Sequence, residues 1–259
     1  MIEHTTTFTL TSAILAAMTV GFLVWTRRLA VNSRRYGYAV VGACAAMCVA
    51  YLLMAAELLT VTTTGREESI ARFLGYSIAW GTVCYILGAV SGADRRYTLA
   101  AFGAILTSLW ATMASWILGG RAGTLVSLVI AAGVIALAGV LYGPLAPGEK
   151  RTGSERTLLY TRLKKLTVLV FVGLLVTGIL SEQNLAFTDA FVGQTLATYL
   201  DIVWLAGFGG LVLESTAALS DTAPAAGMNS PPTAGDIVPD SDGDGNANVD
   251  VPETVHAAE

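Results

Sequence analysis

The chain has 259 residues, of which 54% are hydrophobic and 13% are charged, and its formal net charge is −4. A soluble domain carries about 25% charged residues, so this composition, with a mean hydropathy of +0.63, excludes an ordinary soluble protein and predicts a membrane protein. The acidic balance also argues against a nucleic-acid partner, which would require a basic surface.

Seven apolar stretches follow one another along the chain, each bounded by charged or turn residues. Each can cross a hydrocarbon core of about 30 Å as a helix, which requires about 20 residues. None shows the alternation of membrane-crossing strands. The predicted fold is therefore an all-α membrane protein, a seven-transmembrane-helix bundle within residues 1–215. Its predicted spans are about 8–26, 36–62, 70–93, 97–119, 123–145, 157–180 and 187–214.

The distribution of basic residues predicts the orientation, because Lys and Arg near span ends stay on the cytoplasmic side. Twelve of the fifteen basic residues flank the first, third and fifth connections. We therefore expect the N-terminus outside and the C-terminus in the cytoplasm of a multi-pass plasma-membrane protein. Because its charges follow it, the first stretch reads as a retained span and not as a secretion signal. The twelve residues are Arg27, Arg28, Arg34, Arg35, Arg95, Arg96, Lys150, Arg151, Arg156, Arg162, Lys164 and Lys165.

Two charged side chains fall inside predicted spans. Arg72 lies about one turn inside the third span, and Asp201 lies deep in the seventh. A charge in mid-span costs roughly 2.5–3.5 kcal/mol on insertion scales, so each residue needs a partner or a function. Arg72 could extend to the lipid headgroups, and Asp201 could be a protonated carboxyl group bonded to a neighbouring helix. Pairing of the two across the bundle would satisfy both.

Residues 216–259 form a predicted disordered, acidic, cytoplasmic tail, since they contain no Lys or Arg and too few apolar residues for a core. Asp240, Asp242 and Asp244 are spaced like the first half of a calcium loop. Position twelve of such a loop needs a bidentate Glu, but Val251 stands there. We favour a solvated acidic tail over a calcium site and expect no metal centre elsewhere.

Two motifs in the spans point to a family. The third span opens with Ala71-Arg72-Phe73, and the seventh reads D-x-x-x-x-x-G-F-G from Asp201 to Gly209. With seven spans and an outside N-terminus, the chain resembles the microbial rhodopsins, particularly the haloarchaeal bacteriorhodopsin-like opsins, over about residues 8–215. Weaker matches are Tyr38-Ala39, Leu163 to Thr167, and Ser181-Glu182.

The resemblance implies a retinal chromophore held as a Schiff base by a lysine four residues after the counter-ion aspartate. Asp201 occupies the aspartate position, and Leu205 occupies the lysine position on the same helix face. The only lysines of the chain are Lys150, Lys164 and Lys165, all at the predicted cytoplasmic edge. Covalent attachment of retinal by the family's chemistry is therefore excluded by the residue inventory.

The resemblance also indicates that the proton path is lost. Gly75 and Ile86 occupy the positions of the proton acceptor and donor carboxylates of pumping relatives, and neither side chain can hold a proton. A chloride pump would also keep the lysine. What survives is the pair Arg72 and Asp201, together with Glu182 at the outer mouth, where relatives carry a proton-release carboxylate.

The aromatic residues that clamp retinal in this family are only partly kept. Tyr76 and Phe171 stand where the family has Trp, whereas Leu174 and Gly178 replace a Tyr and a second Trp. Trp residues can equally serve as core or interfacial packing. The candidate pocket-lining residues are Tyr76, Trp80, Phe171, Leu174, Gly178 and Trp204.

Two functions remain in contention. The first is a non-photochemical opsin homologue that binds partners in the membrane as a regulator, subunit or scaffold. Besides lipids, its partners could be another rhodopsin, an enzyme of the carotenoid or retinal pathway, or a second copy of itself. The second is a carrier or photosensor that binds retinal or a carotenoid non-covalently. A passive channel is less favoured, and no nucleophile–base arrangement indicates an enzyme, since His4 and His256 lie at the two chain ends.

Overall fold

Seven long helices make up the computed structural model of the chain, which describes residues 4–63, 66–118, 120–146, 154–180, 187–215 and 219. All seven are long and apolar enough to cross a membrane, so the predicted seven-helix fold is confirmed. The orientation of the termini stays a prediction. The helices are α1 His4–Arg28, α2 Arg34–Ala55, α3 Ile70–Ser91, α4 Arg95–Ile117, α5 Gly120–Tyr142, α6 Ser154–Leu180 and α7 Ala190–Glu214.

The second predicted span, 36–62, is wrong at its end, because α2 stops at Ala55. Glu57 and Leu59 then adopt positive φ angles of 55° and 58°, which a helix does not allow. The β-branched stretch that follows forms the strand β1, Thr60–Thr63, which pairs antiparallel with β2, Arg66–Ser69. The hydropathy pattern predicts a longer span because residues 58–61 are largely apolar, but the chain has already left the helix at Glu57.

Most other helix bounds lie within a few residues of the predicted spans. α1 and α6 begin earlier, at His4 and Ser154, and α7 begins later, at Ala190. The residues at the starts of α1 and α6 are polar, so hydropathy does not include them in the spans. Helical hydrogen bonding continues through them because a helix needs an apolar surface only within the hydrocarbon core.

The predicted tail lies outside the described residues except for Leu219. This side chain is buried, with 1% exposure, and joins the hydrophobic core of the bundle. The first compact unit of the chain accordingly runs over Met1–Ala223. The packed body therefore extends past the predicted boundary at residue 215, because an apolar leucine follows the end of α7 closely enough to reach the core.

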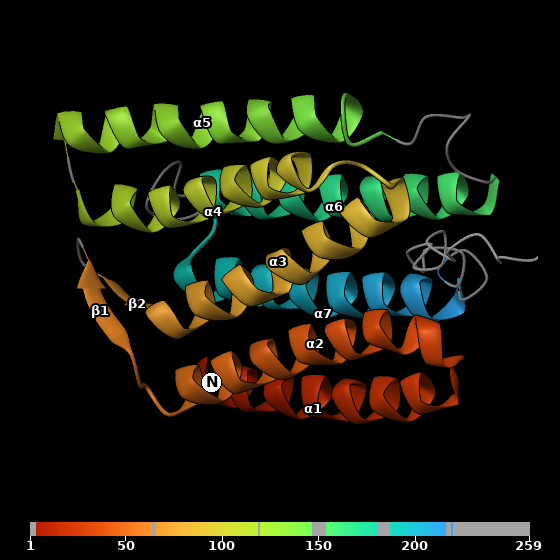
Figure 1. Cartoon of the computed structure of the whole chain (residues 1–259). Coiled ribbons are helices and arrows are strands. Elements are labelled where there is room, and N and C mark those ends of the chain that lie inside the picture. Colours follow the sequence, from red (N-terminus) through yellow and green to blue (C-terminus); the bar gives the residue numbers. More distant parts are fainter. Residues whose placement is uncertain are drawn as a thin grey trace, which may run out of the picture. The chain divides into compact units, whose positions relative to one another are not determined.

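The helices pack so that α3 is the most enclosed. α3 packs against α2, α4 and α6, whereas α7 packs against α1, α2 and α6, and α5 packs against α4 at the edge of the bundle away from α1 (Figure 1). In α3, 61% of its 18-residue apolar segment is buried, compared with 17% in each of α4, α5 and α6. The region between α3 and α7 is therefore where a charged side chain is best separated from lipid and water.

The close approach of α7 to α1 and α2 depends on Gly209. A Cβ atom added there would lie 2.6 Å from Cε2 of Phe22 and 2.9 Å from Cγ1 of Val40. Both distances are shorter than a van der Waals contact. The adjacent Gly210 differs, since an added Cβ would meet nothing within 4 Å. Only the first of these two glycines is required by packing.

We predict that Gly209→Val destabilises the bundle by about 1–3 kcal/mol, the usual cost of overpacking. Gly210→Val is the matched control, because it makes the same change one residue later in open space, and it should alter stability by no more than about 0.5 kcal/mol. Equilibrium unfolding of the two purified variants by SDS measures both. Equal effects would contradict the packing role of Gly209.

Candidate functional site

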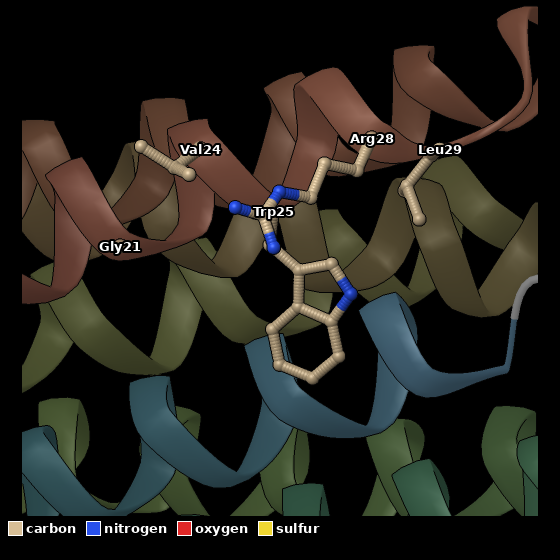
Figure 2. Close-up of a pocket in the computed structure, with 5 residues that line it drawn as sticks. All are labelled: Gly21, Val24, Trp25, Arg28 and Leu29. Atoms are coloured by element: carbon tan, nitrogen blue, oxygen red, sulfur yellow. The ribbon is translucent and has the colours of Figure 1, made fainter.

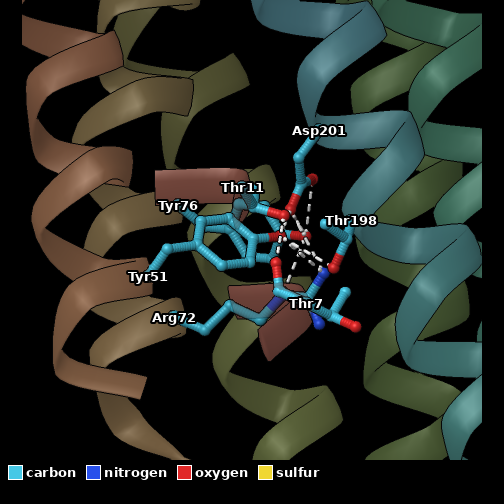
Figure 3. A network of polar contacts seen from close by, with 7 residues as sticks. All are labelled: Thr7, Thr11, Tyr51, Arg72, Tyr76, Thr198 and Asp201. Carbon is cyan, nitrogen blue, oxygen red and sulfur yellow. Dashed lines mark hydrogen bonds and ion pairs between the residues drawn. The ribbon is translucent and has the colours of Figure 1, made fainter. Parts of the chain in front are cut away.

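Asp201 is the centre of a polar network in the middle of the bundle. Its side chain, on α7, is fully buried and accepts hydrogen bonds from the Tyr51 hydroxyl at 2.6 Å and the Tyr76 hydroxyl at 2.7 Å. The Nη2 atom of Arg72 lies 3.1 Å from its Oδ2 atom. Figure 3 shows these side chains converging on Asp201. A buried carboxylate is tolerated only when donors surround it in this way.

Helix periodicity explains how side chains from three helices meet at Asp201. Arg72 and Tyr76 are four residues apart on α3, so they share one face of that helix, and Thr198 and Asp201 share a face of α7 in the same way. Tyr51 enters from the last turns of α2. The network thus joins α2, α3 and α7.

Arg72 points into the bundle and not toward the lipid headgroups. Besides its ion pair, Nε donates to the Tyr76 hydroxyl at 3.2 Å and Nη2 donates to the Tyr51 hydroxyl at 3.4 Å. The guanidinium carbon also lies 5.4 Å and 5.9 Å from the ring centroids of Tyr76 and Tyr51. Its side chain is 13% exposed. Of the alternatives for the two in-span charges, the geometry matches pairing across the bundle.

Two members of the network, Tyr51 and Thr198, are not among the residues predicted from the sequence. Tyr51 supplies the shortest hydrogen bond to Asp201, and its hydroxyl also lies 3.3 Å from Oγ1 of Thr198. Tyr76 was assigned only to pocket lining. A buried tyrosine hydroxyl needs a partner, which is a signal readable from sequence, but the sequence does not show which helix faces supply it. Thr11 of α1 lies beside the network in Figure 3, although its hydroxyl donates to the Thr7 carbonyl of its own helix.

The network is balanced within itself. One guanidinium and one carboxylate face each other, and the hydroxyl groups of two tyrosines donate further hydrogen bonds to the carboxylate oxygens. In the low dielectric of a bundle interior such contacts are stronger than in water. The arrangement therefore serves as a polar link between helices, and all of its charge is neutralised by its own members.

Three of the candidate pocket residues form an aromatic cluster one turn from Asp201. The rings of Trp80 on α3 and Trp204 on α7 are in contact in a tilted arrangement, with centroids 4.1 Å apart and planes at 31° to each other. Phe171 on α6 meets Trp80 edge-on at 5.7 Å. A flat ligand between two rings needs about 3.5–4.0 Å on each of its faces, so nothing fits between these two indoles.

Packing fills most of the other predicted positions that the structure describes. Leu205 is 3% exposed and Ile86 is fully buried. A Cβ atom on Gly75 would lie 2.8 Å from that of Ala50, so α2 occupies the space of a side chain there. Leu174 packs against the core, whereas an added Cβ at Gly178 would meet nothing within 4 Å. The remaining predicted positions lie outside the described residues: Glu182, Asp240, Asp242 and Asp244.

The described lysines do not approach this site. Lys164 on α6 places Nζ 4.2 Å from the ring centroid of Tyr142 and 5.5 Å from that of Tyr160. Lys165 is exposed, and Lys150 lies outside the described residues. Within the described part of the chain, no group of three or more His, Cys, Asp or Glu side chains could hold a metal ion.

A seven-helix membrane bundle with an arginine of the third helix paired to an aspartate of the seventh defines an opsin-type membrane protein. The model of the family described as "Bacteriorhodopsin-like protein" matches residues 3–219. The chain therefore belongs to the bacteriorhodopsin-like family, the microbial rhodopsins, and is a multi-pass membrane protein.

Characterised relatives and solved structures agree with this assignment. Sensory rhodopsin-2 of Natronomonas pharaonis is 28% identical over 227 residues, covering 85% of this chain and 92% of the relative. Sensory rhodopsin-2 of Haloarcula vallismortis is 24% identical over 174 residues, which cover 64% of this chain and 70% of the relative.

Two solved structures share the fold. Thermophilic rhodopsin from Rubrobacter xylanophilus superimposes with a TM-score of 0.78 at 18% identity, covering 85% of this chain and 99% of that one. The light-driven proton pump of Coccomyxa subellipsoidea superimposes with a TM-score of 0.72 at 19% sequence identity. The match covers 83% of this chain and 98% of that one. At these identities the likeness extends to the fold alone.

We predict that Asp201→Ala destabilises the bundle by about 3–5 kcal/mol, because it leaves the Arg72 guanidinium buried without its anion. The matched control is Asp94→Ala. Asp94 pairs with Arg96 at the same 3.1 Å, but the two side chains are 66% and 72% exposed. Loss of this surface pair should cost no more than about 1 kcal/mol. Thermal unfolding of both purified variants compares them, and unchanged stability of Asp201→Ala would refute the role of the network.

Proposed function

We propose that this microbial rhodopsin homologue does not bind retinal covalently and is not a light-driven pump. It acts without catalysis, by contact with other proteins in the membrane, as a regulator, subunit or scaffold. The observation that carries this proposal is Leu205, a buried apolar side chain one helical turn after Asp201.

A Schiff base forms only between an aldehyde and a primary amine, and Leu205 has no amine. No lysine occurs anywhere in α7. Lys164 is directed to an aromatic pair formed by Tyr142 and Tyr160, and not to Asp201. The residues at the family's chromophore site therefore do not fit covalently bound retinal.

The loss of pumping is supported by the same region. Proton transfer needs groups that can take up and release a proton. Gly75 and Ile86, at the positions of the family's acceptor and donor, have side chains without such groups. Asp201 remains, but its carboxylate is engaged by Arg72 and two tyrosine hydroxyls. This arrangement favours a structural use of the retained charges.

The partners proposed for this role are membrane lipids and one further membrane protein. Family association suggests another rhodopsin, an enzyme of the carotenoid or retinal pathway, or a second copy of the chain. Helices with many small residues, such as α5, allow a neighbouring helix to approach closely. α5 also presents large exposed apolar side chains, including Leu125, Leu128 and Ile135.

Retinal titration tests the proposal. All-trans retinal is added to the purified chain, and borohydride reduction then fixes any Schiff base before peptide mapping by mass spectrometry, which separates α7 from the peptides that carry Lys150, Lys164 and Lys165. We expect no visible absorption band and no mass increase in α7, because that helix has no amine. Leu205→Lys is the comparison, since it restores an amine one turn from Asp201. A visible band with covalently retained retinal in the unmodified chain would contradict the proposal.

A second candidate function is non-covalent binding of retinal or a carotenoid. Two buried polar atoms favour it, since Nε1 of Trp204 and Oγ1 of Thr167 have no hydrogen-bond partner among the described residues. The open space beside Gly178 also favours non-covalent binding, because it leaves room next to α6. In the titration above, a saturable, structured change in the near ultraviolet without any mass increase would establish this alternative.

A further inference from the structure

The hairpin of α1 and α2 carries four positive charges and no negative ones. No Asp or Glu occurs between His4 and Ala56, whereas Arg27, Arg28, Arg34 and Arg35 cluster at the connection of the two helices. The charge of this end of the bundle is therefore not balanced by the elements that carry it.

Two of these arginines have structural tasks. Arg34 donates from Nε to the Leu29 carbonyl at 3.0 Å and from Nη2 to the Arg27 carbonyl at 3.2 Å, so it caps the end of α1. Arg35 donates to the Tyr36 hydroxyl at 2.8 Å. Arg28 has no ion pair or hydrogen bond through its side chain to any residue that the structure describes. It is therefore available to a ligand.

Arg28 lies over a shallow groove on α1. The groove has a volume of about 370 Å³ and is lined by Gly21, Val24, Trp25, Arg28 and Leu29. Figure 2 shows the Arg28 side chain running back along the helix, so that its guanidinium lies between Val24 and Trp25. Val24 and Trp25 are 47% and 43% exposed, and Gly21 leaves the inner part of the groove without a side chain.

The chemistry of the groove changes along its length. The guanidinium of Arg28, which lies between Val24 and Trp25, offers paired N–H donors that match phosphate oxygens better than an ammonium group does. Next to it stands an exposed indole, the side chain typical of the boundary between headgroups and hydrocarbon. Beyond lies an apolar notch one to two turns deeper along the helix, at Gly21 and Val24. A cation beside an exposed indole and an apolar surface matches the phosphate and the upper acyl chain of a phospholipid.

We propose that this groove binds an anionic phospholipid, with its phosphate on Arg28 and the upper part of one acyl chain along Trp25 and Gly21. Charge complementarity selects this occupant, because the hairpin supplies an excess of cations and no competing carboxylate. The site is independent of the proposed function and of any chromophore.

Quenching of Trp25 fluorescence tests the proposal. The full chain is placed in nanodiscs that contain the same mole fraction of acyl-brominated phosphatidylglycerol or acyl-brominated phosphatidylcholine. Subtracting the signal of Trp25→Phe isolates Trp25 from the other four tryptophans. We expect apparent binding of the brominated anionic lipid to exceed that of the zwitterionic lipid by about fivefold, the effect of one arginine close to an anionic headgroup.

Substitution of the arginine provides the decisive comparison. Arg28→Gln, measured with and without Trp25→Phe, should remove the preference for the anionic lipid, and Arg28→Lys should retain part of it. Arg162→Gln removes an exposed arginine outside the groove and should leave the preference intact. Equal quenching by both lipids in the unmodified chain would overturn the proposal, because it would show no selection of the anionic headgroup. A preference that survives Arg28→Gln would also overturn it.

Discussion

The ion pair between Arg72 and Asp201 is the interaction on which the centre of this bundle depends. Its N–O distance is 3.1 Å, and the carboxylate is completely buried. Removing two charges from water costs several kcal/mol per ion, and only good geometry with additional hydrogen bonds compensates for that cost. Tyr51 and Tyr76 supply those hydrogen bonds from two further directions. Without a lysine in α7, Arg72 is the cation that Asp201 requires.

The surroundings of the pair are closely packed by the chain's own side chains. Gly75 lets α2 approach α3 until Ala50 occupies the adjacent space. The tilted rings of Trp80 and Trp204 have centroids 4.1 Å apart, whereas a flat ligand between them would hold the rings about 7 Å apart. A buried leucine follows Asp201 by one turn. These contacts fill the region around the ion pair with helix packing.

Much of this architecture follows from sequence for physical reasons. The cost of charge in lipid makes hydropathy a reliable indicator of the seven helices, and the same cost predicts that Arg72 and Asp201 need each other. Tyr51 and Thr198 could not be assigned as partners, because spacing along one helix does not fix its rotation against the next. The end of α2 was misplaced because apolar composition does not register the positive φ angles of Glu57 and Leu59. Contact between the rings of Trp80 and Trp204 likewise depends on how α3 and α7 face each other.

The central claim is that Arg72 and Asp201 neutralise each other and thereby hold α3 to α7. A double-mutant cycle of Arg72→Met and Asp201→Leu, read by the free energy of unfolding in a defined detergent, tests it most directly. Either single variant leaves one buried charge unpaired, whereas the double variant leaves none. The predicted result is that the double variant recovers most of the stability lost in each single variant, with a coupling energy well above the roughly 1 kcal/mol of a surface pair. Additive losses in the double variant would contradict the claim.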